Sequence, residues 1–120
     1  MKDFKKVAQD LQGGSFVYKD REKIDKDLLI ATYPDGVTIV GADLVTGDSG
    51  IYAVALFAEN DRQYINGGKA LTDIVKEWMV GYNDDCEKMS ADLKASGGVK
   101  VKFVKTKTKT GHDFYLVSIV

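Results

Sequence analysis

Hydrophobic residues near the start of the chain recur at a spacing of three or four, as on one face of a helix. Gly13-Gly14 follows this stretch, so we predict a short amphipathic N-terminal helix that ends there. The apolar triplet 16–18 predicts a short strand, and the charged run 19–27 interrupts any longer pattern. We therefore expect a helix, a short strand and a loop at the beginning of the chain. The residues of the predicted helical stripe are Phe4, Val7, Ala8 and Leu11.

The middle of the chain carries the apolar runs of a β-sheet. Segments 28–33 and 37–45 are rich in aliphatic and β-branched residues, and Pro34-Asp35-Gly36 between them is typical of a turn. We therefore predict a β-hairpin from these two segments. The continuous apolar run 51–58 predicts a central strand that is covered on both faces, and 62–65 predicts a shorter strand after it.

Beyond Gly67-Gly68 the apolar period becomes helical, and a second helix and a hairpin follow. We expect Asn83 to cap the second helix, in which Cys86, Met89 and Leu93 form a narrow stripe, and Gly97-Gly98 to end it. Segments 99–110 and 113–120 alternate apolar and polar residues, so they predict a closing antiparallel hairpin. The stripe of the first helix consists of Leu71, Ile74, Val75, Trp78 and Met79.

This order of elements predicts a single domain, residues 1–120, of the mainly β type with helices (α+β). Three strands, a helical segment and two further strands follow the order of an OB-fold, a five-stranded Greek-key barrel. The chain would add an N-terminal helix and a helical insertion before the last two strands. The alternative architecture is an antiparallel sheet with helices on one face.

Composition and cysteine use favour a cytoplasmic protein. No apolar run approaches the roughly 20 residues that span a bilayer, and the charged start leads into no signal-peptide pattern. The lone Cys86 has no partner for an internal disulfide, which agrees with a reducing compartment. We expect Cys86 to be a half-buried helix residue and predict no contact with a membrane.

Charge is unevenly distributed although the net charge is only -1. Residues 28–98 contain five Lys or Arg and eleven Asp or Glu, whereas residues 99–120 contain five lysines and Asp113 alone. The last two strands therefore predict a local basic surface.

Two segments in the centre of the chain resemble a known family. Ile51 to Glu59 reads IYAVALFAE, and Tyr64 to Trp78 reads YINGGKALTDIVKEW. This pattern is similar to that of the small single-stranded-DNA-binding proteins of phages and conjugative elements of Gram-positive bacteria. The resemblance implies an OB-fold and sequence-tolerant binding of single-stranded DNA in replication, recombination or transfer.

Binding a single strand requires cations for phosphates and exposed aromatic faces on which bases stack. The period of two in 105–109 would project three lysines on one side. The alternative interpretation is that the lysines only protect a solvated sheet edge and that the rings pack into the core. The candidate cations are Lys100, Lys102, Lys105, Lys107, Lys109, Arg62 and Lys69, and the candidate stacking residues are Tyr52, Tyr64 and Tyr115.

The residues that could carry catalysis lack partners in the sequence. A nucleophile needs an adjacent base and an orienting group, but His112 is the sole histidine. Asp84-Asp85 and Glu87 lack the glycine turn of a calcium loop, so we predict no metal site. Because no nucleophile with its base is recognisable, we also predict no cofactor and no enzymatic activity. We predict a noncatalytic protein that binds single-stranded DNA, with homo-oligomer formation left open. The alternative function is a small protein-interaction or inhibitor domain that uses the acidic middle region.

Overall fold

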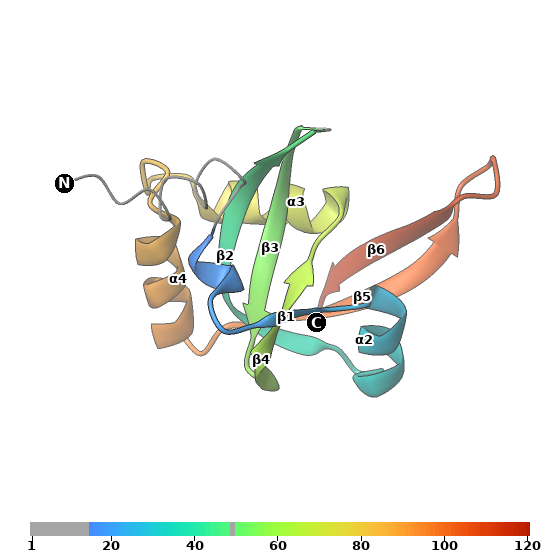
Figure 1. The fold of residues 1–120 in the computed structure, drawn as a ribbon, viewed down its shortest axis with the longest axis horizontal. Helices are drawn as coiled ribbons and strands as arrows, with labels where there is room; N and C mark the ends of the chain where they lie inside the picture. The colour runs from blue at the N-terminus through green and yellow to red at the C-terminus, as the bar shows by residue number, and fades with distance from the viewer. Residues whose placement is uncertain (1–14, 49) are drawn as a thin grey trace.

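The computed structural model describes residues 15–48 and 50–120, so the predicted N-terminal helix lies outside the described residues. Figure 1 shows a strongly curled sheet with helices packed around it and a two-stranded arm that projects to one side. The described elements are η1 (Phe16–Tyr18), β1 (Glu22–Ile24), α2 (Lys26–Thr32), β2 (Val37–Gly47), β3 (Gly50–Phe57), β4 (Asn60–Asn66), α3 (Lys69–Trp78), α4 (Cys86–Ala95), β5 (Val99–Lys107) and β6 (Asp113–Ile119).

The sheet is an open half-barrel with the strand order β1-β4-β3-β2-β5-β6. All neighbouring strands are antiparallel except β1 and β4, which are parallel. β5 pairs with β2 only over residues 99–101, and beyond that point β5 and β6 continue as the projecting arm. The α+β class is confirmed, but six strands replace the predicted five because β1 adds an edge strand to β4.

Three local predictions at the beginning of the described chain are wrong. Residues 28–32 of the predicted strand 28–33 form most of α2 and Tyr33 follows at its end, so Pro34-Asp35-Gly36 joins a helix to β2. A short apolar run fits either a helix or a strand, and within α2 Leu29 is fully buried while the neighbouring Leu28 is exposed. Residues 16–18 form a 3₁₀ turn, and β1 lies within the predicted loop 19–27.

The later elements agree with the prediction. The strands predicted at 37–45, 51–58 and 62–65 correspond to β2, β3 and β4, and the closing hairpin is confirmed as β5 and β6. α3 buries Leu71 and Val75, and Trp78 packs half-buried against the core. The second helix starts later than expected, because the side chain of Asp85 rather than Asn83 accepts the capping hydrogen bond, from the Lys88 amide. No helix among residues 15–48 and 50–120 is long and apolar enough to cross a membrane.

β3 is covered on both faces, as the sequence predicts for a central strand. Ala53, Ala55 and Phe57 face the main core. The three helices complete it with Leu29 of α2, Leu71 and Val75 of α3, Met79 directly after α3, and Met89 of α4. The alternate residues Tyr52, Val54 and Leu56 belong to a second, smaller cluster on the outer face. Val17 of η1 is fully buried in this second cluster.

Two buried side-chain hydroxyls form hydrogen bonds with the strand backbone at points where the neighbouring strand has ended. Ala42 of β2 lies beyond the short β2–β5 pairing, and Ser90 of α4 takes the place of the missing strand. The Ser90 Oγ accepts a hydrogen bond from the Ala42 amide at 2.9 Å and donates one to the Ala42 carbonyl at 3.0 Å. Both backbone groups of Ala42 are therefore satisfied by one side chain.

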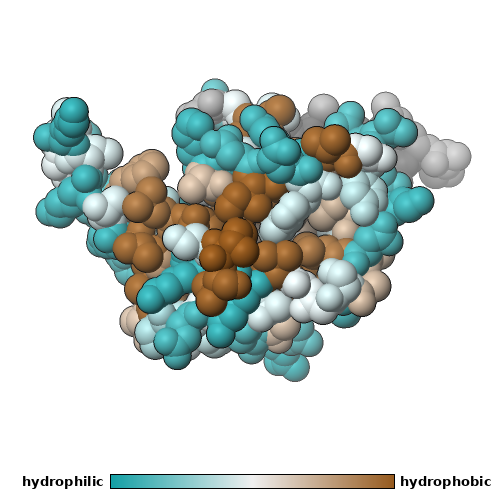
Figure 2. All heavy atoms as spheres, turned by 180° about the vertical axis from the view of Figure 1, so that it is seen from behind, coloured by the Kyte–Doolittle hydropathy of each residue, from teal (hydrophilic) through white to brown (hydrophobic). Residues whose placement is uncertain are grey.

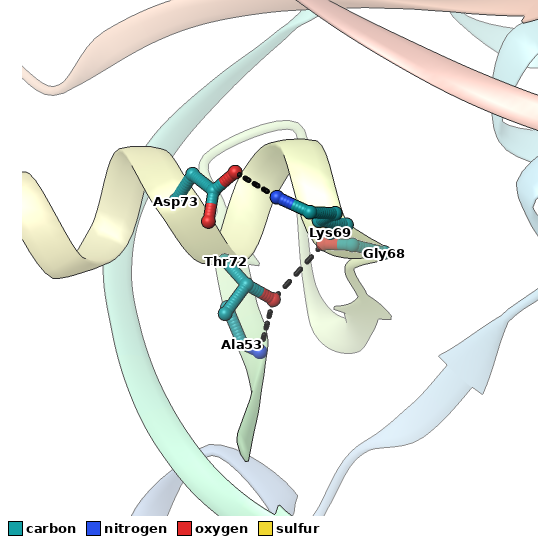
Figure 3. A network of polar contacts seen from close by, with 5 residues as sticks. All are labelled: Ala53, Gly68, Lys69, Thr72 and Asp73. Carbon is teal, nitrogen blue, oxygen red and sulfur yellow. Dashed lines mark hydrogen bonds and ion pairs between the residues drawn. The ribbon is translucent and has the colours of Figure 1, made fainter. Parts of the chain in front are cut away.

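Thr72 of α3 performs the equivalent task for β3 (Figure 3). β4 ends at Asn66, and the Ala53 amide donates instead to the Thr72 Oγ1 at 2.9 Å, while the Gly67 amide donates to the Ala53 carbonyl. The Thr72 hydroxyl in turn donates to the Gly68 carbonyl. Gly67 must be glycine here, since a Cβ would lie 2.4 Å from the Leu71 side chain.

Replacement of either hydroxyl should destabilise the fold, because a buried backbone amide then loses its partner. We expect Ser90→Ala and Thr72→Val each to lower the free energy of unfolding by about 1–3 kcal/mol in urea denaturation. The exposed Ser118→Ala serves as the control and should stay within about 0.5 kcal/mol of the wild type. A Ser90→Ala variant as stable as Ser118→Ala would contradict the assigned role of Ser90.

Candidate nucleic-acid interface

Three tyrosines gather on the outer face of the sheet, around the second cluster. The ring centroids of Tyr18 and Tyr64 lie 5.0 Å apart with their planes tilted by 58°. The Tyr18 and Tyr52 hydroxyls share a hydrogen bond of 3.2 Å. All three rings are half-buried, so each packs against the cluster and keeps part of its surface open to solvent. The arrangement joins one ring each from η1, β3 and β4 into a common aromatic surface.

The first turn after the undescribed segment holds Tyr18 in this position. Ser15 caps η1 by accepting from the Val17 amide, and its hydroxyl donates to Asp43 of β2 at 2.6 Å. Arg21 then donates from its Nε to the Asp61 carbonyl at 2.9 Å and fastens the segment to the start of β4. η1 therefore lies across the strands with Val17 buried beneath it.

Two cations, from β4 and β1, lie close to these rings. Arg62 is two residues before Tyr64 in β4, but the β3–β4 register is irregular between the pairs Leu56–Tyr64 and Phe57–Asn60, so strand alternation does not fix the face of its side chain. Lys23 of β1 lies directly beside Tyr64 in the parallel register, so it also projects outward. Both cations are exposed. The structure thus brings the sequence-predicted Tyr52 and Tyr64 together, with Lys23 beside Tyr64 and Arg62 two residues away along β4.

The lysines of the β5–β6 arm divide between its two faces. Val101 and Phe103 are buried, so the odd-numbered residues of β5 face inward and the even-numbered ones outward. Lys100 is opposite Thr38 in the β2–β5 register, which places Lys100 and Lys102 on the tyrosine-bearing face of the sheet. Lys105 and Lys107 share the inner face, and Lys109 follows the end of β5 in the turn.

Lys105 and Tyr115 fasten the arm to α2 rather than standing free. The Tyr115 hydroxyl donates to Asp27 at 2.8 Å, and the Lys105 Nζ lies 3.2 Å from Asp27 and 3.5 Å from Asp113. The Lys26 Nζ lies 5.0 Å from the centre of the Tyr115 ring. The hydrogen bonds from Tyr115 and Lys105 lower the pKa of Asp27. We call these four residues of α2, β5 and β6 the arm contact: Lys26, Asp27, Lys105 and Tyr115.

Lys69 lies apart from the tyrosines, at the start of α3, which packs against the main core. Its Nζ forms an exposed ion pair with Asp73 at 2.9 Å, one helical turn away. Figure 3 shows this pair beside the Thr72 network. The structure therefore does not bring Lys69 together with the other candidate cations.

The remaining candidate chemistry in the described residues is sparse. Cys86 is half-buried, as expected, and burial raises the pKa of its thiol to about 11. A thiol with this pKa is protonated at neutral pH and is a poor nucleophile. Among the described residues no three His, Cys, Asp or Glu side chains gather as a metal site would require. His112 is exposed in the turn of the arm.

Tyr18 and Lys23 are the two members of this surface that the sequence analysis does not identify. The sequence does contain a signal for the turn that carries Tyr18. Ser15, a residue type that commonly caps helices, directly precedes the apolar triplet 16–18. Lys23 gives no such signal, since only its pairing with β4 brings it beside Tyr64.

Comparison of the chain with protein-family models, curated proteins and solved structures finds no match.

The half-buried phenols of Tyr18 and Tyr64 predict a loss of stability at alkaline pH. Burial raises the pKa of Tyr18 and of Tyr64 above the ordinary value of 10.0, and the hydrogen bond with Tyr52 adds to the shift of Tyr18. Unfolded tyrosine ionises near pH 10 while the folded rings remain neutral, so this stabilisation is complete below pH 10 and declines above it. Urea midpoints measured from pH 8 to 11 should fall less steeply in Tyr18→Phe/Tyr64→Phe than in the wild type. Parallel curves would contradict the burial of these hydroxyls.

Proposed function

We propose that this protein binds single-stranded DNA without sequence preference, using the outer face of the curled sheet. Bases would stack on the open surfaces of Tyr52 and Tyr64, and phosphates would contact Arg62, Lys23 and the outward lysines of the arm. The observation that carries this proposal is the placement of partly exposed rings on the same face as Lys23, Lys100 and Lys102, three cations that form no ion pair within residues 15–48 and 50–120. Proteins that bind single strands without sequence preference generally combine a positively charged surface along the phosphate backbone with aromatic side chains on which the bases stack.

The strand order supports this use of the outer face. Without β1, the order β4-β3-β2-β5-β6 contains a three-stranded meander followed by a hairpin that adds to its first strand. We propose that these five strands correspond to a partly open OB-fold barrel. The tyrosines Tyr52 and Tyr64 then stand on its second and third strands, which form the oligonucleotide-binding face of such barrels.

The arm would form the second side of this binding surface. Lys100 and Lys102 leave the sheet on the tyrosine-bearing face, and Lys107 and Lys109 are exposed toward its tip. Phosphate binding at Lys105 would have to compete with Asp27 and Asp113, which already neutralise it. We therefore assign the main phosphate contacts to the outward pair.

The resemblance to single-stranded-DNA-binding proteins of phages and conjugative elements supplies the biological setting of the proposal. We propose a noncatalytic, cytoplasmic protein that coats DNA during replication, recombination or transfer of a phage or mobile element. Fluorescence anisotropy with labelled oligothymidine at low and moderate salt tests it directly. Binding that weakens with salt supports the proposal, and failure to bind at low salt would overturn it.

Loss of an aromatic face should weaken binding without changing its salt dependence. We expect Tyr64→Leu to cost about 1–3 kcal/mol of oligothymidine binding free energy, whereas Tyr64→Phe retains the ring and should bind nearly as the wild type does. The control is Tyr82→Leu, because Tyr82 lies between α3 and α4 and hydrogen-bonds to Asp92. Equal binding by Tyr64→Leu and Tyr64→Phe, with both variants folded, would exclude Tyr64 as a stacking residue.

Loss of outward lysines should instead flatten the salt dependence. Each phosphate contact on a single strand contributes about 0.7 to the slope of log affinity against log salt, so Lys100→Ala/Lys102→Ala should reduce the slope by up to about 1.4. The control Lys69→Ala/Lys76→Ala removes the same charge from α3 and should leave the slope nearly unchanged. Lys105→Ala/Lys107→Ala tests the inner face, and a larger effect there than for the outward pair would contradict the assigned path.

A further inference from the structure

β6 is an open edge of the sheet. The Val120 amide donates to the Lys100 carbonyl, and the Thr108 amide donates to the His112 carbonyl. Even-numbered residues of β6 therefore bond toward β5, since the register between the two strands is continuous. The amides and carbonyls of the odd-numbered residues point away from β5. In the described part of the chain no strand pairs with this outer edge.

The two edges of the sheet differ in how they are protected. β1 has only three residues, and its exposed Glu22 and Lys23 are charged. Short length and charge are the usual means by which edge strands avoid pairing with other strands. β6 has seven residues, and Asp113 at its beginning is its sole charge. All lysines of the arm lie in β5 or in the turn, so none protects the open edge.

The arm also exposes apolar side chains beside this edge. Val104 and Leu116 form a cross-strand pair on the outer face, with 40% and 45% of their surface exposed. Phe114 and Ile119 of β6 are exposed as well. Figure 2 shows hydrophobic side chains from the base of the projecting arm across the middle of the face seen from behind.

We propose that β6 pairs in antiparallel fashion with β6 of a second copy of this chain, around a two-fold axis at Leu116. In this register Asp113 lies opposite Ile119 and Tyr115 opposite Val117, and these odd-numbered residues are those whose backbone groups are free. The strand is thus complementary to itself in hydrogen bonding. The two copies would form one continuous twelve-stranded sheet from two six-stranded ones.

The same register matches the side chains. Leu116 meets Leu116 of the second copy at the axis, and Val104 extends this pair on either side into an apolar row across four strands. The two Asp113 carboxylates stand at opposite ends of the pairing, about 20 Å apart at 3.4 Å per residue. No like charges face each other, which is the condition that a homodimeric strand pair has to meet. A second copy therefore fits this edge in both its backbone and its side chains.

Analytical ultracentrifugation without DNA tests the pairing separately from the proposed DNA binding. We expect the wild type to show a concentration-dependent monomer–dimer equilibrium, and Leu116→Lys to weaken it by about tenfold or more, because two lysines then face each other at the axis. Val104→Lys adds the same charge one strand away and should have a smaller effect. Thermal melts followed by circular dichroism check that both variants remain folded.

Cross-linking locates the axis. In a background of Cys86→Ser, Leu116→Cys should form an intermolecular disulfide under mild oxidation, since directly opposed non-hydrogen-bonded residues bring their Cβ atoms to about 4.5–5.5 Å. Val104→Cys is the matched control, because it is similarly exposed but would lie about 14 Å from its counterpart across three strand spacings. A wild type that stays monomeric at about 100 μM, or equal cross-linking at both positions, would overturn the proposal. Oligothymidine binding by the reduced Leu116→Cys variant, which adds no charge to the outer face, shows independently whether the DNA interface is intact.

Discussion

The strongest constraint on this fold is the need to satisfy the backbone of β2 and β3 where neighbouring strands leave them. β5 departs from β2 after three paired residues, and β4 ends before it reaches the beginning of β3. Ala42 and Ala53 are fully buried at these points, so their amides cannot turn to water. Ser90 and Thr72 supply the missing partners, and these are the two polar residues buried in the described core. These two hydroxyls help to fix the positions of α3 and α4, in addition to the apolar packing of both helices on the core.

The curl of the sheet explains why it has two hydrophobic faces. The β2–β3 register shifts between Ile39 and Gly41, and such a bulge bends the strand. At Gly41 a Cβ would lie 3.2 Å from the Leu56 side chain and 3.4 Å from Ser90, so the absence of a side chain permits the close approach of α4. The inner face of the bent sheet is filled by the helices. Of the elements in residues 15–48 and 50–120, η1 packs on the outer face, and a cluster this small leaves the edges of its aromatic rings in solvent.

The sequence predicts the parts of the fold in which local pattern and tertiary context agree. The continuous apolar run of β3 is long enough to indicate a strand covered on both faces, and the 3.6-residue stripe of α3 is similarly clear. In α2 the pattern is ambiguous, since Leu28, Leu29 and Ile30 suit a strand. In the structure Leu29 is buried in the core, Ile30 packs against it and Leu28 is exposed, so tertiary packing and not the local pattern decides for a helix. For the candidate nucleic-acid interface, the sequence predicts which types of residue take part, but not which of them lie together in the structure. Tyr52 and Tyr64 come together, whereas Asp27, the shared partner of Lys105 and Tyr115, lies in α2, far away in sequence.

The alternation of side chains in β5 makes the lysines of the arm unequal, although the sequence presents them as one basic stretch. The inward Lys105 is held by Asp27 and Asp113, and Tyr115 beside it donates to the same Asp27. These exposed ion pairs contribute little stability individually, but the contacts of Lys105 and Tyr115 with Asp27 connect the arm to α2 at a point beyond its pairing with β2. The inward residues thereby orient the arm, and within the described residues the outward Lys100 and Lys102 form no ion pair. A ligand on the outer face could therefore use a preformed surface, whereas a ligand at Lys105 would first have to break the contact that positions the arm.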